Sequence, residues 1–219
     1  MRGLFITFEG TEGGGKSTQI LRLAERLTAL RLKVRPLREP GGTPIGEEIR
    51  HTLKHSSVNH AMTPEAELLL MNASRAQLVR EVIRPALQNG EIVLCDRFYD
   101  STVAYQGYGR QLALPRVHSV IDFAVDGTRP HLTLLLRVPM AVSEARRVNR
   151  GLVERDRFEE ADRQFFQRVE EGYDAIAENE PERVKVIDAT RTIEAVGDDV
   201  WRLVQPLVDA TVAANQEPK

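Results

Sequence analysis

The feature that most constrains this chain is a glycine-rich loop between an apolar run and a helical pattern. Residues 10–17 read Gly-Thr-Glu-Gly-Gly-Gly-Lys-Ser, which satisfies the spacing G-x-x-x-x-G-K-[ST]. Apolar residues at 4–9 predict a strand directly before this phosphate loop, and the pattern at 16–30 predicts a helix directly after it. A strand, such a loop and a helix in that order are typical of a site that binds the phosphates of a nucleotide.

The residue types in the phosphate loop suit a nucleoside triphosphate. Its glycines let successive backbone N–H groups turn inward around phosphate oxygens, which side chains with a Cβ would obstruct. Lys16 supplies a cation to the β and γ phosphates, and Ser17 supplies a hydroxyl to magnesium. An ordinary glycine-rich turn is the alternative interpretation, which the flanking strand and helix disfavour. The predicted ATP-binding residues are Gly10, Thr11, Glu12, Gly13, Gly14, Gly15, Lys16, Ser17 and Thr18.

Short apolar runs of strand length alternate with longer helical patterns along the chain. The runs lie at 4–9, 33–39, 91–96, 132–138 and 184–188. The helical patterns lie at about 16–30, 44–54, 63–89, 115–124, 140–150, 162–179 and 193–212, and Pro85 is expected to bend or shorten the third of them. This alternation predicts an α/β three-layer sandwich in which helices cover a five-stranded, largely parallel sheet.

Length and composition exclude several classes of protein. With 219 residues, of which 42% are hydrophobic, the chain is long enough for one core, and we expect a single domain over 1–219. The 30 basic and 32 acidic residues disfavour a protein that binds duplex nucleic acid. A single cysteine, no signal-peptide pattern and no stretch of roughly 20 apolar residues predict a soluble cytoplasmic protein. We expect small-molecule partners, and neither nucleic acid nor a membrane.

A second carboxylate is expected beside the phosphate loop. The run at 91–96 ends in Asp96, which Arg97 follows. A carboxylate at the end of a neighbouring parallel strand can hold magnesium or its waters. A simple surface ion pair between Asp96 and Arg97 is the alternative. The predicted metal ligands are therefore Ser17 and Asp96.

Residues 146–168 differ from the rest of the chain in composition. The segment holds seven of the 25 arginines among five acidic residues. By itself it fits a solvated helix face held by ion pairs equally well. Arg146 and Arg150 are four residues apart, so a helix that continues from residue 140 places both on one face.

Six blocks of residues resemble the bacterial thymidylate kinases, which are nucleoside monophosphate kinases. The blocks are Phe-Glu-Gly-Thr-Glu-Gly at 8–13, Arg-Glu-Pro-Gly-Gly-Thr at 38–43, Ala-Ser-Arg at 73–75, Asp-Arg-Phe at 96–98, a stretch within 100–107 that ends in Tyr-Gln-Gly, and Asp-Arg-Phe-Glu at 156–159. The second and fifth blocks are the most specific. The resemblance implies the P-loop containing nucleoside triphosphate hydrolase fold, with strand order 2-3-1-4-5. It also implies a homodimer, for which we expect apolar helix faces such as that of Leu68, Val79 and Val82.

The resemblance further implies a reaction. The γ-phosphoryl group of ATP passes to thymidine 5′-monophosphate (dTMP) with Mg²⁺ as cofactor, giving dTDP and ADP, a step toward dTTP for DNA synthesis. Arg97 would hold the acceptor phosphate, and lid arginines would stabilise charge that develops during transfer. The implied catalytic residues are Lys16, Arg97, Arg146, Arg150, Arg155 and Arg157. The last four belong to a mobile lid at about 146–160, with Gly151 as its hinge.

The same resemblance implies an acceptor pocket. Its dTMP-binding residues are Glu12, Glu39, Pro40, Met71, Arg75, Arg97, Thr102, Tyr105 and Gln106. Arg75 would donate to a thymine carbonyl, and Thr102 and Gln106 would read the pyrimidine edge. Glu12 would accept from the 3′-hydroxyl, and Tyr105 would crowd the 2′ position of the ribose. Met71 stands where the family usually has a phenylalanine stacked on thymine; its sulfur can still pack on the ring, or Met71 is a plain core residue.

Two other functions remain open at this point. One is another small-molecule kinase of the same architecture, acting on adenylate, cytidylate, uridylate or a non-nucleotide acceptor. The other is a nucleotide-dependent switch, although the guanine-reading sequence Asn-Lys-x-Asp is absent from the chain. Three further sets of residues carry no functional expectation: His51, His55 and His60 lack the spacing of a metal site, Cys95 reads as a buried apolar residue, and Trp201 and Tyr173 fall at helical core positions.

Overall fold

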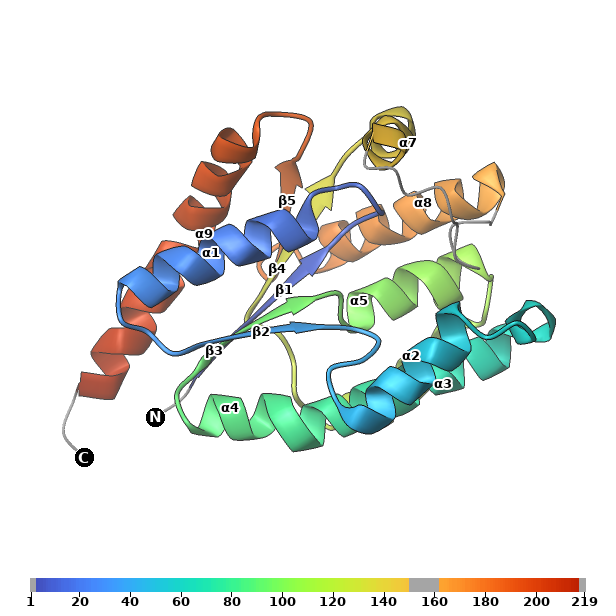
Figure 1. The fold of residues 1–219 in the computed structure, drawn as a ribbon, viewed down its shortest axis with the longest axis horizontal. Helices are drawn as coiled ribbons and strands as arrows, with labels where there is room; N and C mark the ends of the chain where they lie inside the picture. Colours follow the sequence, from blue (N-terminus) through green and yellow to red (C-terminus); the bar gives the residue numbers. More distant parts are fainter. Residues whose placement is uncertain (1–2, 150–161, 217–219) are drawn as a thin grey trace.

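The computed structural model describes residues 3–149 and 162–216. A five-stranded parallel sheet in the order β2-β3-β1-β4-β5 forms its middle layer (Figure 1). The strands are β1 (Leu4–Glu9), β2 (Val34–Arg38), β3 (Ile92–Asp96), β4 (Leu132–Arg137) and β5 (Val184–Asp188). The expected fold class and strand order are confirmed, and the central position of β1 places the phosphate loop in the middle of one sheet edge.

The register aligns the carboxyl ends of the first three strands in the sheet. Phe8 of β1 and Arg38 of β2 both lie opposite Asp96 of β3. Because parallel strands expose their carboxyl ends at one edge, the loops that follow β1, β2 and β3 converge there. This convergence brings together segments that are about 30 to 90 residues apart in the sequence.

Helices connect and cover the strands. They are α1 (Lys16–Ala29), α2 (Pro44–Lys54), α3 (Pro64–Leu78), α4 (Arg84–Gln88), α5 (Tyr99–Thr102), α6 (Leu114–Val125), α7 (Met140–Asn149), α8 (Arg163–Asn179) and α9 (Ile193–Gln216). A 3-10 turn, η1 (Asn59–Ala61), and two π-helical segments, η2 (Val79–Ile83) and η3 (Val103–Gly109), join them. Thr43 and Thr63 each accept from a backbone N–H three residues later, and a proline follows each of them, which explains where α2 and α3 begin.

Two apolar cores lie on opposite faces of the sheet. On one face, α1 and α9 lie side by side (Figure 1), and Leu23 and Val204 pack with Ile6, Leu94 and Leu134 of the strands. The other face is covered by α3, α6, η3 and α8, whose buried residues pack with those of the same strands that point the opposite way, Phe5, Val93 and Leu135. Adjacent residues of a buried strand point to opposite faces, which is why each strand feeds both cores.

The helical pattern expected at 63–89 is interrupted. The π-helical segment η2 stands between α3 and α4, directly before the turn that contains Pro85. A proline removes a backbone donor and crowds the preceding turn, and a π-bulge is one way in which a helix accommodates it. The expected irregularity is therefore present. The helical segments α5 and η3, in contrast, were not expected from the sequence.

The face proposed for a homodimer is wrong in its residues. Leu68 and Val79 are 6% and 0% exposed, because this side of α3 and η2 packs into the core, where Val82 is also half-buried. The exposed large apolar side chains on these layers are instead Leu69 of α3 and Phe123 of α6, at 58% and 80%. Within the described ranges, no helix combines the length and the apolar character needed to cross a membrane.

Candidate active site

The phosphate loop turns sharply between β1 and α1. Gly10, Gly13 and Gly15 have φ angles of 125°, 75° and 89°, in the region that favours glycine. A Cβ at Gly10 would lie 2.3 Å from the carbonyl oxygen of Leu136. Lys16 Nζ folds back over the loop and donates to the carbonyl oxygens of Gly10 and Thr11 over 3.1 and 3.0 Å. Burial, together with the nearby Arg97 guanidinium, lowers the pKa of Lys16.

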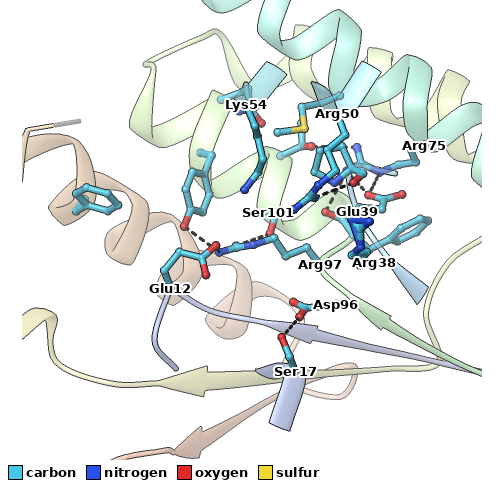
Figure 2. A pocket seen from close by; sticks show the side chains of 17 residues that line it. Glu12, Ser17, Arg38, Glu39, Arg50, Lys54, Arg75, Asp96, Arg97 and Ser101 are labelled. Carbon is cyan, nitrogen blue, oxygen red and sulfur yellow. Dashed lines mark hydrogen bonds and ion pairs between the residues drawn. The ribbon is translucent and has the colours of Figure 1, made fainter. Parts of the chain in front are cut away.

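The two predicted metal ligands meet at the end of the loop. Ser17 lies in the first turn of α1, and its Oγ donates to Asp96 Oδ2 over 2.7 Å (Figure 2). The pair is a hydroxyl and a carboxylate, the oxygen donors that Mg²⁺ takes in phosphoryl-transfer sites. The described residues hold no cluster of three or more histidine, cysteine, aspartate or glutamate side chains suited to a metal ion. The donor set therefore fits an ion that is bound chiefly through phosphates and water.

A cavity of about 250 Å³ opens beside the Ser17–Asp96 pair, at the carboxyl ends of β2 and β3. Residues from the phosphate loop, α2, α3, η3 and α8 complete its walls. All nine residues that the family resemblance assigned to the acceptor line this cavity: Glu12, Glu39, Pro40, Met71, Arg75, Arg97, Thr102, Tyr105 and Gln106. The fold thus gathers into one space side chains that are spread over almost 100 positions of the sequence.

Arg97 lies at the floor of the cavity and is held from several sides (Figure 2). Its φ angle is 70°, and its backbone N–H donates to the Phe8 carbonyl over 2.9 Å. One side-chain nitrogen, Nη2, donates to Glu12 Oε1 over 2.9 Å, and the other, Nη1, donates to Ser101 Oγ over 3.0 Å. Lys16 and Arg97 hold the pKa of Glu12 well below its usual range. The guanidinium therefore faces the cavity with a fixed orientation, paired with an ionised carboxylate.

Glu9 and Tyr173 belong to the hydrogen-bond network that holds Arg97, and no role for either was predicted from the sequence. Glu9 Oε1 accepts from the backbone N–H of Phe98 over 2.7 Å, while Glu9 Oε2 accepts from Ser101 Oγ over 2.5 Å and from the Tyr173 hydroxyl over 3.0 Å. Burial and the nearby Asp100 carboxylate raise the pKa of Glu9 to about 7. Tyr173 is buried at a core position as expected, and its hydroxyl also belongs to this hydrogen-bond network.

Arg75 lies at the opposite end of the cavity and is 2% exposed. It makes five hydrogen bonds, as many as a guanidinium has N–H groups. Two go to Glu39 Oε2, and the others go to Asn72 Oδ1, Thr102 Oγ1 and the Phe98 carbonyl, with lengths between 2.7 and 3.1 Å. A thymine carbonyl would therefore have to share a donor that already has a partner. Glu39 Oε1 has no partner among the described residues, and burial raises the pKa of this carboxyl.

Three cations at the rim of the cavity were not expected (Figure 2). Arg38 ends β2 and pairs with Glu47 over 3.0 Å, and Arg50 donates to the Pro40 carbonyl over 2.9 Å. Lys54 reaches the cavity from the same helix as Arg50. The spacing of Arg50 and Lys54, four residues apart on a predicted helix, was the signal that could have identified them as a shared face.

The lid prediction concerns mostly residues outside the described ranges. Arg150, Arg155 and Arg157, together with Gly151, lie in 150–161. Arg146 lies on α7, and its guanidinium reaches the Gly13 carbonyl at 3.4 Å and the Thr190 carbonyl at 3.5 Å. Arg146 thus contacts the phosphate loop and is not among the residues that line the cavity.

Comparison with known proteins agrees with this geometry. A sequence model of the thymidylate kinase family matches residues 8–200. The thymidylate kinase of Syntrophotalea carbinolica is 49% identical over 201 residues, which cover 90% of this chain and 93% of the relative. That of Deinococcus radiodurans is 47% identical over 203 residues, with coverages of 93% and 97%. The crystal structure of thymidylate kinase from Ehrlichia chaffeensis superposes with a TM-score of 0.75 at 33% identity, covering 94% of this chain and 99% of that one. A match of this length to the sequence model, to relatives near half identity and to a solved structure shows that the chain belongs to the thymidylate kinase family.

Proposed function

We propose that this chain transfers the γ-phosphoryl group of ATP to dTMP, giving ADP and dTDP, a step toward dTTP for DNA synthesis. One observation carries the proposal. The phosphate loop, the Ser17–Asp96 pair and a cavity lined by all nine expected acceptor residues lie side by side at one sheet edge. Phosphoryl transfer depends mainly on the alignment of donor and acceptor phosphates and on the positive charge around them, and this arrangement supplies both.

The donor side acts through the phosphate loop. Backbone N–H groups of the loop and the N-terminus of α1 bind the ATP phosphates, and Lys16 places its charge at the transferring group. Ser17 and Asp96 would hold Mg²⁺, which neutralises charge on the β and γ phosphates when bound. Arg146 approaches the same loop from α7. Together with Arg150, Arg155 and Arg157 it is assigned to the lid, which stabilises charge on the transferring group.

The acceptor side acts through Arg97. Its fixed guanidinium suits bidentate binding of the dTMP phosphate, and Glu12 is placed to move from Arg97 to the 3′-hydroxyl as the phosphate arrives. Tyr105 closes the sugar end, where its hydroxyl lies 3.3 Å from Arg97 Nη2. Thr102 and Gln106 lie along the base end, and Met71 packs where the thymine ring enters.

We further propose a homodimer and a cytoplasmic enzyme. The exposed Leu69 and Phe123 lie on α3 and α6, two helices that cover the same face of the sheet, and they support an apolar contact between two copies. The cytoplasm supplies ATP, and the free, buried thiol of Cys95 suits a reducing compartment.

The deciding experiment measures ADP release, coupled to a reporter reaction, with ATP, Mg²⁺ and one acceptor at a time. The acceptors are dTMP, dUMP, UMP, CMP, AMP and none. A preference for dTMP of a hundredfold or more is the expected outcome. Preference for another monophosphate would keep the phosphate chemistry and overturn the acceptor, and ADP release that no acceptor stimulates would favour a nucleotide-dependent switch.

A further inference from the structure

A buried carboxylate on α3 holds the side chain of Gln106, which lines the acceptor cavity from η3. Gln106 Nε2 donates to Glu67 Oε1 over 2.7 Å, and the two residues are 1% and 0% exposed. An ionised carboxylate accepts hydrogen bonds and donates none. The amide nitrogen of Gln106 therefore has to face Glu67, and its amide oxygen has to point away from Glu67.

The amide oxygen of Gln106 is left for a ligand. Within the described part of the chain, Gln106 Oε1 has no hydrogen-bond donor, since the only side-chain bond of Gln106 is the one to Glu67. This oxygen is also not among the described side-chain atoms that are sealed from solvent without a partner. Because Gln106 lines the cavity, Oε1 opens onto that space as an acceptor.

Arg110, the residue that follows η3, donates hydrogen bonds to Glu67, so Glu67 acts as an acceptor. Arg110 Nε donates to Glu67 Oε1 over 3.3 Å, and Arg110 Nη2 donates to Glu67 Oε2 over 3.1 Å. A guanidinium stays charged and can only donate. The direction of each hydrogen bond is thus set in turn: Arg110 donates to Glu67, Glu67 accepts from Gln106, and Gln106 accepts from the ligand.

We propose that Glu67 and Arg110 are positioning residues that make this site select pyrimidines with a proton on N3. Thymine and uracil carry an N3–H donor, whereas N3 of cytosine is an acceptor. Gln106 Oε1 can accept a hydrogen bond from the N3–H of thymine or uracil. It repels the lone pair on N3 of cytosine. A site that has committed its polar groups in this way rejects a ligand that leaves them unpaired. The inference rests on the proposed function. It adds that Glu67 and Arg110, which do not contact the base, select it by fixing the orientation of the Gln106 amide.

The test is the isosteric variant Glu67→Gln. Arg110 only donates, so the new amide keeps its oxygen at the Oε2 position, where it accepts from Arg110 Nη2, and its nitrogen takes the Oε1 position toward Gln106, at the cost of the 3.3 Å bond from Arg110 Nε. Gln106 then has to reverse, and its Nε2 faces the cavity as a donor. The ratio of kcat/KM for dTMP to that for dCMP should fall at least ~10-fold. The dTMP to dUMP ratio should stay within about twofold of its wild-type value, because these substrates share N3–H and differ only in a methyl group that Gln106 does not contact.

Two further variants complete the design. Arg110→Lys perturbs the same cluster but keeps Glu67 as a carboxylate, so the dTMP to dCMP ratio should stay at the wild-type value. Glu67→Gln with Arg110→Gln removes both charges of this ion pair together, so it serves if the single variant fails to fold. With neither charge present, Gln106 is free to reverse, and the ratio should again fall.

The outcomes separate the two proposals. An unchanged dTMP to dCMP ratio in the folded Glu67 variants, or an equal fall in Arg110→Lys, overturns the role of Glu67 and leaves the kinase assignment intact. A wild-type protein that phosphorylates dTMP, dUMP and dCMP no faster than it hydrolyses ATP alone overturns the proposed function itself.

Discussion

Glu9 shows how a single buried acid can make the stability of the fold depend on pH. The folded protein raises the pKa of Glu9 from 4.5 to about 7, because burial and Asp100 disfavour its charge. Between these pH values the folded state keeps a proton that the unfolded chain has lost. The free energy of unfolding therefore falls as the pH rises from about 4.5 to about 7, by about 3 kcal/mol, and this loss is complete above that pH.

The variant Glu9→Gln tests this coupling. An amide can keep the bond from the Phe98 N–H and donate its own N–H to Ser101 and Tyr173, whose hydroxyls can turn to accept. Relative to wild type, the variant should gain about 3 kcal/mol of stability between pH 5 and pH 8. Urea unfolding followed by circular dichroism measures the difference, with the exposed Glu182→Gln as control. Parallel curves for wild type and Glu9→Gln would contradict the raised pKa.

Arg97 should tolerate even lysine poorly. A lysine keeps the charge but cannot bond Glu12 and Ser101 at once while presenting two parallel donors to a phosphate. In Arg97→Lys, kcat/KM for dTMP should fall by roughly 10- to 100-fold. Steady-state kinetics with each substrate varied in turn measure these constants, and KM for ATP should stay nearly unchanged. The surface control Arg129→Lys should also leave KM for ATP nearly unchanged. A rise in KM for ATP alone would assign Arg97 to the donor side.

At the scale of elements, α8 and η3 pack so closely that a glycine is required between them. A Cβ on Gly172 would lie 2.9 Å from the ring of Tyr108 and 3.0 Å from Ala104 Cα. Because η3 carries Tyr105 and Gln106, the position of α8 determines how far these side chains reach into the cavity.

The variant Gly172→Ala should therefore move η3 and affect both stability and the acceptor site. Overpacking of this kind costs about 1–3 kcal/mol of the free energy of unfolding. KM for dTMP should rise while KM for ATP changes little. The control is Gly197→Ala in α9, where the nearest atom to a Cβ is the Gln19 side-chain oxygen at 3.3 Å, so its stability should stay within about 1 kcal/mol of wild type. If Gly172→Ala and Gly197→Ala changed the free energy of unfolding equally, α8 and η3 would be able to move apart at little cost.

The elements also mark the limit of sequence-based prediction. Strands and long helices were predictable because their apolar period is strong, and the phosphate loop because its spacing is rare. Residues 99–109 were not, since a four-residue helix and a π-helical segment with two glycines carry no 3.6-residue period. The support that Glu9, Ser101 and Tyr173 give to Arg97 was equally hidden, because these residues are 72 to 164 positions apart and only the fold joins them. The family resemblance indicated the acceptor residues, but not the hydrogen-bond directions that Glu67 imposes.

At the scale of the whole molecule, self-association is the remaining expectation. Phe123 of α6 is 80% exposed and, with Leu69 of α3, forms the proposed apolar contact between two copies. Light scattering at micromolar concentration should give about twice the 24.6 kDa of one chain. Phe123→Asp should shift the mass toward the monomer without unfolding it, while a charge at the exposed Val58 should not. A wild-type monomer would remove the dimer proposal.

The two apolar cores support different parts of the proposed site. The donor loop leads into α1, which is anchored in the core on one face, whereas Phe98 and Tyr105 of the acceptor cavity belong to the core on the other face. Substitutions near Phe98 and Tyr105 are therefore expected to disturb the packing of one core. The helix that follows the phosphate loop packs in the other core. We therefore expect a change of acceptor to require substitutions mainly on the face of the sheet that carries Phe98 and Tyr105, whereas Glu12 and Ser17, which border the same cavity, limit how far the two proposed sites can vary independently.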